Sequence, residues 1–406
     1  MKILVINSGS SSIKFQLIQM PSETLICSGL VERIGQKDAI LNYKAANADI
    51  RETHCIENHN QGLTHIANLL LDAKNGVIKN KREIEVVGHR VVHGGNSFSD
   101  TTLITEEVKQ KIKGYSVLAP LHNPNNYEGI NVAEKLFPDA KQAAIFDTAF
   151  FRSLPQKAKR YAIPEKLYKE HKIQVYGFHG TSHKYVSEKA LEYLKLKKSK
   201  IITIHLGNGC SMTAVEDGKS IDHNLGFTPS NGLIMGTRSG DIDHAIIFYL
   251  VNSLGYDLNK VNTILNKESG MLGLTGFTDL RDIEAEAARG NEDCKLALAM
   301  NAYKIKKFIG AYAAAMNGLD AIVFTAGIGE NSNVIRNLVC EDMDYFGIDI
   351  DSSKNEIRGK NIREISSAYS KTKVLVIPTN EELEIAKQSY ELVNSFHDLS
   401  LSDSNC

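Results

Sequence analysis

The sequence predicts an α/β protein built from two similar halves. Segments rich in β-branched residues alternate along the chain with segments whose apolar residues recur at helical spacing, which is typical of βαβ units. The segments "KILVINSGSSSIKFQLI" (2–18) and "KIITIHLGNGCSMTAVE" (200–216) also share one order: a Lys, a β-rich run, a turn holding Asn, Gly and Ser, and a second β-rich run. We therefore predict a duplicated domain whose two hairpins line a shared cleft. Two unrelated hairpins remain the alternative.

The elements follow in order. The first hairpin has a turn of about six residues, Asn7 to Ser12, between two strands. Buried strands are predicted at 83–95 and 142–150, and a helix at 182–196 with Ser182 as its N-cap. Residues 201–222 are predicted as three strands joined by turns. Residues 320–339 are predicted as strand, glycine turn and helix, with Asn331 or Ser332 as cap, and 373–396 as strand, polar turn and amphipathic helix.

Composition excludes several classes of protein. The 406 residues are enough for two or three domains, and a net charge of −1 argues against a protein-wide footprint for nucleic acid or an anionic membrane. The six cysteines form no C-x-x-C pair, so we expect neither a disulfide framework nor a zinc site, and a reducing cytoplasm fits. The apolar stretch 308–329 is interrupted by Asn317, Gly318 and Asp320, which argues against a membrane helix.

Three glycine-containing turns each follow a predicted strand: Asn7–Lys14, "HLGNGCS" (205–211) and "TAGIGENS" (325–332). None has P-loop spacing, and a single glycine most often just permits a positive φ. Together they favour a nucleotide whose phosphates and adenosine need close approach of the backbone.

Several charged residues lie in apolar or glycine-rich segments, where a solvent-exposed charge is not expected. Arg90 stands in an apolar strand and Arg238 beside glycines, so the two could clamp a carboxylate or phosphate. Asp147 interrupts an apolar run. Glu381 and Glu382 begin a helix, where they either complement the helix dipole or bind magnesium beside phosphates.

A pair of histidines offers another reading. His179 and His183 are four residues apart, as in a zinc-binding pair on a helix. Gly177 and Gly180 argue against a helix there, and the sequence shows no obvious third ligand. A zinc hydrolase is therefore a weak alternative, and a hydrogen-bonded structural role is the ordinary one for either histidine.

Eight ordered blocks resemble the acetate kinase family: "ILVINSGSSSIKF", "GHRVVHGG", "FDTAF", "GFHGTSH", "HLGNG", "GFTPSNGLIMGTRSGDID", "GIGEN" and "PTNEE". The resemblance implies a duplicated ribonuclease-H-like, or actin-like ATPase, fold of two domains around a central cleft. It implies an N-terminal domain of residues 1–148 plus 382–406 and a C-terminal nucleotide-binding domain of residues 149–381. The activity implied is reversible phosphoryl transfer between ATP and acetate, giving acetyl phosphate and ADP, in a cytoplasmic homodimer.

The resemblance also assigns residues. Asn7 and Glu381 would hold Mg²⁺, for which Mn²⁺ could substitute. The catalytic residues would be Arg90, Asp147, His179 and Arg238, with Arg90 also binding acetate. The methyl pocket would be Val92, Leu121, Phe178 and Pro229. ATP or ADP would contact Lys14, His205, Leu206, Gly207, Asn208, Gly209, Asp279, Leu280, Arg281, Gly327, Ile328, Gly329, Glu330 and Asn331.

The ionisation of acetate and the positions that differ from the family pattern both bear on this assignment. A carboxylic acid such as acetate is already ionised at pH 7, so no general base is needed, and Asp147 is expected to orient magnesium waters or a neighbouring arginine. The sequence departs from the family pattern at Phe151, at His223 with Asn224, and at His244, which leaves the rim of the site and the substrate preference open. A propionate or butyrate kinase on the same fold is the nearest alternative. A chaperone-like or filament-forming ATPase is the alternative from another class.

Overall fold

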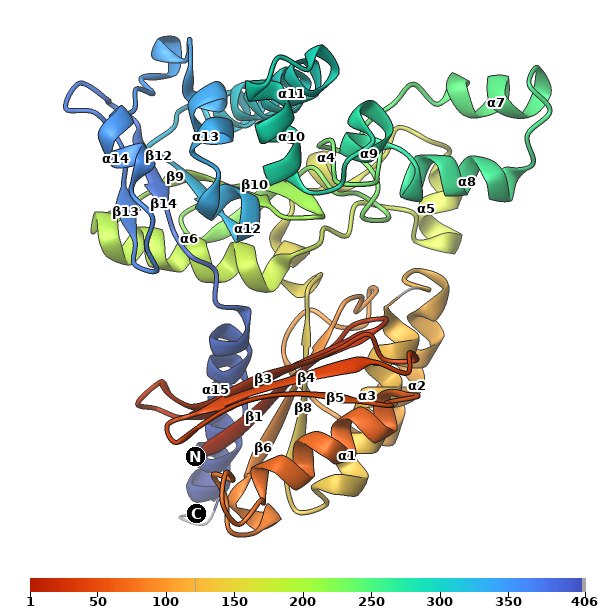
Figure 1. Cartoon of the computed structure of the whole chain (residues 1–406), viewed down its shortest axis with the longest axis vertical. Helices are drawn as coiled ribbons and strands as arrows, with labels where there is room; N and C mark the ends of the chain where they lie inside the picture. The colour runs from red at the N-terminus through yellow and green to blue at the C-terminus, as the bar shows by residue number, and fades with distance from the viewer. Residues whose placement is uncertain (121, 404–406) are drawn as a thin grey trace. The chain divides into compact units, whose positions relative to one another are not determined.

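The computed structural model describes the backbone of residues 1–120 and 122–403, and side chains as far as residue 395. The chain forms two compact units (Figure 1). Unit 1 comprises Met1–Phe150 and Asn380–Cys406, and unit 2 comprises Phe151–Thr379. Glu381, which the sequence boundaries put in the C-terminal domain, therefore belongs to unit 1 in the structure.

Unit 1 is built on an eight-stranded sheet in the order β5-β4-β3-β2-β1-β6-β8-β7. Strands β1 to β5 form an antiparallel meander, β6 and β8 run parallel to β1, and β7 is antiparallel to β8. The strands are β1 (Lys2–Ser8), β2 (Ser12–Gln19), β3 (Thr24–Glu32), β4 (Ala39–Ala45), β5 (Ala48–His54), β6 (Val86–Val91), β7 (Thr102–Leu103) and β8 (Lys141–Phe146).

Helices cover both faces of this sheet, which explains why residues 3–6 of β1 are all apolar. Leu4 and Ile6 face the core that holds α1 and α3, whereas Ile3 and Val5 face the core that holds α15. Consecutive strand residues point to opposite faces, so a strand covered on both sides has no solvent-facing position. The helices of unit 1 are α1 (His59–Leu70), α2 (Glu106–Gly114), α3 (Asn123–Leu136) and α15 (Glu381–Asp403), with 3₁₀ turns at Lys81–Glu83 and Tyr115–Val117.

Unit 2 is built on a six-stranded sheet in the order β11-β10-β9-β12-β14-β13. Helix α6 packs on one face through Val186 and Ala190, against Ile201, Ala321 and Val323 of the strands. The strands are β9 (Lys200–Leu206), β10 (Cys210–Glu216), β11 (Lys219–His223), β12 (Ala321–Thr325), β13 (Arg363–Glu364) and β14 (Lys373–Val376).

The helices of unit 2 are α4 (Gln156–Lys159), α5 (Glu165–His171), α6 (Gly180–Leu194), α7 (Ala245–Asn252), α8 (Leu258–Lys267), α9 (Gly270–Thr275), α10 (Leu280–Ala288), α11 (Glu292–Met316), α12 (Ala326–Asn331), α13 (Asn333–Cys340) and α14 (Ser352–Glu356). Two further 3₁₀ turns are Ala149–Ser153, at the junction of the units, and Asp344–Phe346. Among the described residues, no helix combines the length and the apolar character needed to cross a bilayer.

The two sheets confirm the predicted duplication. The order β3-β2-β1-β6-β8 in unit 1 is repeated as β11-β10-β9-β12-β14 in unit 2, with a three-strand antiparallel meander followed by two parallel strands in each. The repeated hairpins β1–β2 and β9–β10 occupy the same position in both sheets. The alternative of two unrelated hairpins is therefore wrong.

Three local predictions need correction. The first hairpin is tighter than predicted: Asn7 pairs with Lys14 inside the ladder, and the turn is residues 9–11. Helix α6 begins at Gly180 with His179 as N-cap, two residues before the predicted start, because the Ser182 hydroxyl bonds His205 and Thr379 instead of capping. Residues 326–331 form helix α12 and not an open glycine turn; Ser332 does cap the helix that follows.

Candidate active site

A cluster of charged side chains lies at the end of the parallel strands of unit 1. Arg90 is near the end of β6, and Asp147 directly follows the neighbouring strand β8. The Arg90 guanidinium donates from Nε and Nη2 to Asp147 Oδ2, at 3.0 and 2.6 Å. Its Nη1 donates to Asn7 Oδ1 at 3.4 Å, and its Nε lies 3.7 Å from Glu381 Oε2. The structure thus brings together four residues that are far apart in sequence.

This cluster carries more negative than positive charge. Glu382 is buried and forms an ion pair of 2.8 Å with Lys14, while Arg90 contacts Asp147 and Glu381, so three of these five residues are acidic and two are basic. Burial raises the pKa of Glu381; Arg90 opposes that shift, whereas Asp147 and Glu382 add to it. Burial alone would lower the pKa of Arg90, but Asp147 and Glu381 raise it overall. A cation bound here would relieve the excess negative charge.

The donor set fits Mg²⁺. The cation prefers carboxylate and amide oxygens, and Asn7 and Glu381 supply one of each beside Arg90. Burial first, and then the charges of Asp147 and Glu382, raise the pKa of Glu381, so a bound cation would stabilise its ionised form.

Two residues that the sequence did not single out hold the strand ends in place. The Asn126 side chain on α3 donates to Ser8 O at 2.8 Å and accepts from Val92 N at 3.1 Å, so it ties β1 to the end of β6. A ring nitrogen of His59 lies 2.7 Å from Gly9 O in the first turn. A single asparagine and an isolated histidine carry no sequence signal for such roles.

In unit 2, four predicted residues meet at the second glycine turn. His179 has a left-handed backbone (φ 59°), and its ring stacks on that of His205 with centroids 4.3 Å apart. An ideal Cβ on Gly209 would lie 3.3 Å from His179 Nε2 and 3.7 Å from Arg238 Nη1. The missing side chain of Gly209 therefore leaves a space that an imidazole and a guanidinium both face.

Arg238 is held by its own loop. Its Nη1 donates to Pro229 O at 2.8 Å, which brings two predicted residues together. Burial lowers the pKa of Arg238, and among the described residues no ion pair with a carboxylate is formed by this side chain. A partly buried guanidinium that forms no ion pair with a described carboxylate is suited to binding an anion.

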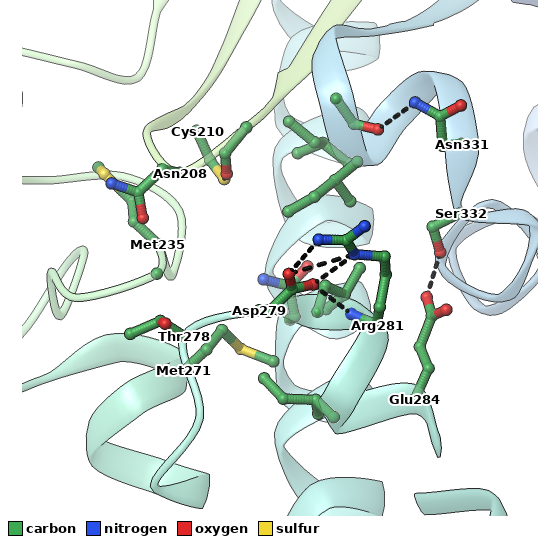
Figure 2. A pocket seen from close by; sticks show the side chains of 18 of the residues that line it. Asn208, Cys210, Met235, Met271, Thr278, Asp279, Arg281, Glu284, Asn331 and Ser332 are labelled. Atoms are coloured by element: carbon green, nitrogen blue, oxygen red, sulfur yellow. Dashed lines mark hydrogen bonds and ion pairs between the residues drawn. The ribbon is translucent and has the colours of Figure 1, made fainter. Parts of the chain in front are cut away.

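A cavity of about 530 Å³ lies in unit 2 beside these residues (Figure 2). Asp279 and Arg281 stand at its wall, where Arg281 Nε donates to Asp279 Oδ1 at 3.0 Å, and Ser332 Oγ donates to Glu284 Oε1 (Figure 2). The predicted nucleotide residues that line it are Leu206, Gly207, Asn208, Asp279, Leu280, Arg281, Gly327, Ile328 and Asn331.

Other predicted nucleotide residues lie elsewhere. Gly209 faces His179, and His205 is buried against Ser182. Gly329 packs on β12, and the Glu330 carboxylate accepts from Thr379 N at 3.1 Å. Lys14 belongs to unit 1. The sequence analysis missed much of the lining, because apolar residues at helical or strand spacing are most often ordinary core. The missed residues include Cys210, Ile234, Met235, Gly236, Met271 and Ile283, and the polar Asn301 and Arg358.

The predicted methyl-pocket residues are distributed over both units. Val92 is buried in unit 1 and directly follows β6. Phe178 is buried in unit 2, where its N–H donates to His223 Nε2 at 3.2 Å, and Pro229 is the carbonyl partner of Arg238. Leu121 lies outside the described residues.

The positions that depart from the family pattern lie mainly behind the site. Phe151 is buried and its ring packs on His223 at 4.1 Å between centroids, while Asn224 Oδ1 accepts from Met212 N at 2.7 Å. His244 is exposed at the start of α7. Phe151, His223 and Asn224 therefore act on the packing under Phe178 and not directly at a surface rim.

The arrangement of His179 and His183 does not favour a zinc site. His183 lies in the first turn of α6, and the two rings share one oxygen, Ser211 Oγ, at 2.8 and 2.7 Å. Within the described residues no group of three His, Cys, Asp or Glu side chains is arranged to hold a metal ion.

Comparisons with known proteins agree with this geometry. The model of the acetokinase family matches residues 2–387. The chain is 63% identical over 395 residues to an acetate kinase of Flavobacterium johnsoniae, covering 97% of this chain and 100% of that protein. It is 53% identical to an acetate kinase of Thermotoga maritima, covering 97% and 99%.

Solved structures give the same result. The crystal structure of Porphyromonas gingivalis acetate kinase matches with a TM-score of 0.91 at 44% identity, covering 97% of this chain and 99% of that one. A propionate kinase of Francisella tularensis matches with a TM-score of 0.90 at 42% identity, covering 96% and 99%. These matches confirm the predicted duplicated fold, and the chain belongs to the acetokinase family.

Proposed function

We propose that this protein is a kinase that transfers a phosphoryl group reversibly between ATP and acetate, forming acetyl phosphate and ADP. The observation that carries the proposal is the 63% identity to an acetate kinase over 97% of the chain. The two groups of charged residues described above supply the chemistry that such a reaction needs.

ATP would bind in the cavity of unit 2. Its volume of about 530 Å³ is within the range of small-molecule sites, and its wall combines apolar side chains with Asp279, Arg281 and Asn331. Glycines 207 and 327 let the backbone come close to the nucleotide.

The main obstacle to the reaction is repulsion between a carboxylate and a polyphosphate. Arg90 of unit 1 and Arg238 of unit 2 are partly buried guanidinium groups that would bind acetate and the transferred phosphoryl group, with His179 donating to the phosphoryl oxygens. Asp147 would hold Arg90 through its bidentate contact and transfer no proton, since acetate is already ionised.

Mg²⁺ would be held by Asn7 and Glu381, with Mn²⁺ as a substitute, and would supply charge neutralisation for the phosphates. Lys14 would lie near the phosphates once released from Glu382.

A hydroxamate assay for acyl phosphate, run with acetate, propionate and butyrate, tests the proposal directly. Acetate should give the highest kcat/KM. Propionate should be poorer by about 10- to 200-fold and not excluded, because one methylene in an apolar pocket discriminates only to that extent. The likeness to a propionate kinase makes propionate preference the second candidate, and a higher kcat/KM for propionate would establish it. ATP hydrolysis that is independent of acetate and stimulated by unfolded peptide would instead indicate a chaperone-like ATPase.

We also propose a cytoplasmic homodimer. Helix α7 has no buried residue, and large apolar side chains at its surface and just beyond it are exposed, including Phe248, Tyr249 and Leu258. Such a patch is typical of an interface between subunits. The free thiols of Cys27, Cys55, Cys210, Cys294 and Cys340 suit a reducing compartment. Light scattering after size-exclusion chromatography would test the oligomeric state.

A further inference from the structure

A chain of hydrogen-bonded side chains runs beneath helix α6 to His179. His179 Nδ1 lies 2.8 Å from Ser211 Oγ, Ser211 Oγ lies 2.7 Å from His183 Nε2, and His183 Nδ1 lies 2.7 Å from Thr203 Oγ1. Thr203, His183 and Ser211 are fully buried. We call these four residues the histidine relay.

The fold places the relay side chains on one face of the sheet. Thr203 pairs with Thr213 across β9 and β10, and His205 pairs with Ser211, so the two strand residues of the relay, Thr203 and Ser211, share the face that α6 covers. His183, in the first turn of α6, then reaches down between two hydroxyls. The polar residues of this face are thereby separated from the solvent, and each must find its partner within the protein.

Counting protons leaves two directions for the relay. Each hydroxyl has one proton, and burial of His183 lowers its pKa well below the ordinary value, so its ring is neutral and has one N–H. In the first direction Thr203 donates to His183, His183 donates to Ser211, and Ser211 donates to His179 Nδ1. In the second, every one of these donations is reversed.

Thr203 decides between the two directions. Within the described part of the chain, its Oγ1 makes a side-chain hydrogen bond only to His183. In the reversed direction the Thr203 proton would be buried without an acceptor, which is unfavourable. In the first direction every proton of the relay is used. His179 Nδ1 then accepts, and the proton of a neutral His179 ring stands on Nε2.

The Nε2 side of the ring is the side that faces the site. Nε2 and the neighbouring Cε1 each lie 3.3 Å from the position of an ideal Cβ on Gly209, and Arg238 Nη1 lies 3.7 Å from the same position. A proton on Nε2 is therefore placed to be donated to an anion in that space, whereas a proton on Nδ1 would be used only within the protein.

We propose that Ser211 and His183 are positioning residues that hold His179 in the Nε2-protonated tautomer, as a neutral hydrogen-bond donor to the transferred phosphoryl group. The proposal rests on the proposed kinase function for its catalytic consequence. The tautomer itself is a property of the protein without substrate. Ser211→Ala removes the hydroxyl that fixes the tautomer and leaves Arg238, the nucleotide cavity and the unit 1 cluster unchanged.

The experiment combines nitrogen NMR with kinetics. Protein labelled with ¹⁵N-histidine, with the His179 resonances assigned from His179→Gln, should show pyridine-type Nδ1 and pyrrole-type Nε2 in the wild type. Ser211→Ala should mix the two tautomers and lower kcat by about 10- to 100-fold, as loss of an outer-shell partner does elsewhere. The KM values for ATP and acetate should change little. In His183→Gln and in the double variant, kcat should fall no further than in Ser211→Ala alone. All three variants interrupt the same chain of hydrogen bonds to His179.

Thr213→Val is the matched control. It removes another buried hydroxyl of β10 that lies 2.8 Å from an imidazole, but this imidazole belongs to His223, outside the relay. It should keep the His179 tautomer and wild-type kcat within about threefold, the scatter that context introduces. An equal loss of kcat in Thr213→Val and Ser211→Ala would overturn the proposal.

The other outcomes are equally distinct. A wild-type His179 with its proton on Nδ1 overturns the relay direction even if no variant folds. An Nε2 proton in the wild type together with unchanged kcat in folded Ser211→Ala overturns the positioning role. If the wild type forms no acyl phosphate, the proposed function fails, while the NMR result still decides the tautomer.

Discussion

At the scale of single residues, Arg90 is the centre of the charge balance in unit 1. Its Nε and Nη2 contact Asp147, its Nη1 contacts Asn7, and its Nε also lies 3.7 Å from Glu381 Oε2. The planar fork of arginine makes this possible, whereas an ammonium would be a point charge. The contacts hold the guanidinium in one orientation before substrate binds, which is the condition for strong electrostatic stabilisation of a transition state.

Replacing Arg90 should therefore affect the chemical step. In Arg90→Ala we expect kcat for acetyl phosphate formation to fall roughly 10²- to 10³-fold, the cost of losing one positioned donor. Arg90→Lys should recover only part of this, because Lys cannot contact both Asp147 and Asn7. Steady-state kinetics on variants with wild-type circular dichroism would check both.

The control for this experiment is Arg82→Ala in the same unit. Arg82 is exposed and pairs with Asp139 at 3.3 Å, a kind of ion pair that contributes little to stability. It should retain full activity. Near-normal turnover in folded Arg90→Ala would mean that Arg90 does not act on the substrate.

At the scale of elements, both candidate regions lie at strand ends and hairpin turns. The turns 9–11 and 207–209 are the matching connections of the two duplicated hairpins. The sequence could predict them because a strand-rich run before and after Asn, Gly and Ser marks a hairpin without any tertiary information. It overestimated the length of the first turn, since Asn7 and Ser12 are polar yet pair within the ladder.

Other elements depended on contacts that one sequence does not reveal. Helix α12 was predicted as an open turn because two glycines weaken a helix; the start of α6 was predicted at Ser182 because serine is a common cap. In the structure Arg336, a buried guanidinium, donates to Gly329 O at 2.9 Å and holds α12. The Ser182 hydroxyl is used by His205. The relay was missed for the same reason: its members come from three elements.

The second hairpin turn allows a test at this scale. In Gly209→Ala the new Cβ would lie 3.3 Å from His179 Nε2, so the ring must shift by a few tenths of an ångström. We expect kcat to fall by about tenfold or more, since small misplacement of a catalytic group has large effects. Thermal stability should change little, because Gly209 does not need a positive φ.

Gly310→Ala provides the comparison for Gly209→Ala. It adds the same methyl group to α11 of unit 2, at an ordinary contact distance of 3.5 Å from Phe346. Its kcat should match the wild type. If folded Gly209→Ala also keeps wild-type kcat, the space above Gly209 is not part of the reaction site.

At the scale of the whole molecule, duplication explains why both units contain buried histidines. Each sheet is covered on both faces, so polar residues that the strands carry are enclosed with the core. Burial lowers the pKa of His89 and His93 in unit 1 to about 4. In unit 2 it lowers that of His223 to about 3 and that of His183 well below the ordinary value. All four are neutral in the folded protein at pH 7.

These four histidines should make the folded protein sensitive to mild acid. A histidine in the unfolded chain takes up a proton near pH 6.5, whereas the buried ones do so only near pH 4 or below. The unfolded state thus binds more protons as pH falls below about 6.5, and each histidine lowers the free energy of unfolding by about 1.4 kcal/mol per pH unit. The raised pKa values of Glu381 and Asp222 act in the opposite direction, as two groups against four.

We therefore expect Tm, measured by calorimetry, to fall steadily as pH is lowered from 7 to 5. His89→Gln should reduce this slope, because the His89 ring is buried in unit 1, where it forms a hydrogen bond with the Gln142 side chain. His171→Gln, at an exposed position of α5, should leave the slope unchanged. A Tm that stays constant over this range would show that the buried rings take up protons as readily as exposed ones, and the neutral state on which the histidine relay depends would then be wrong.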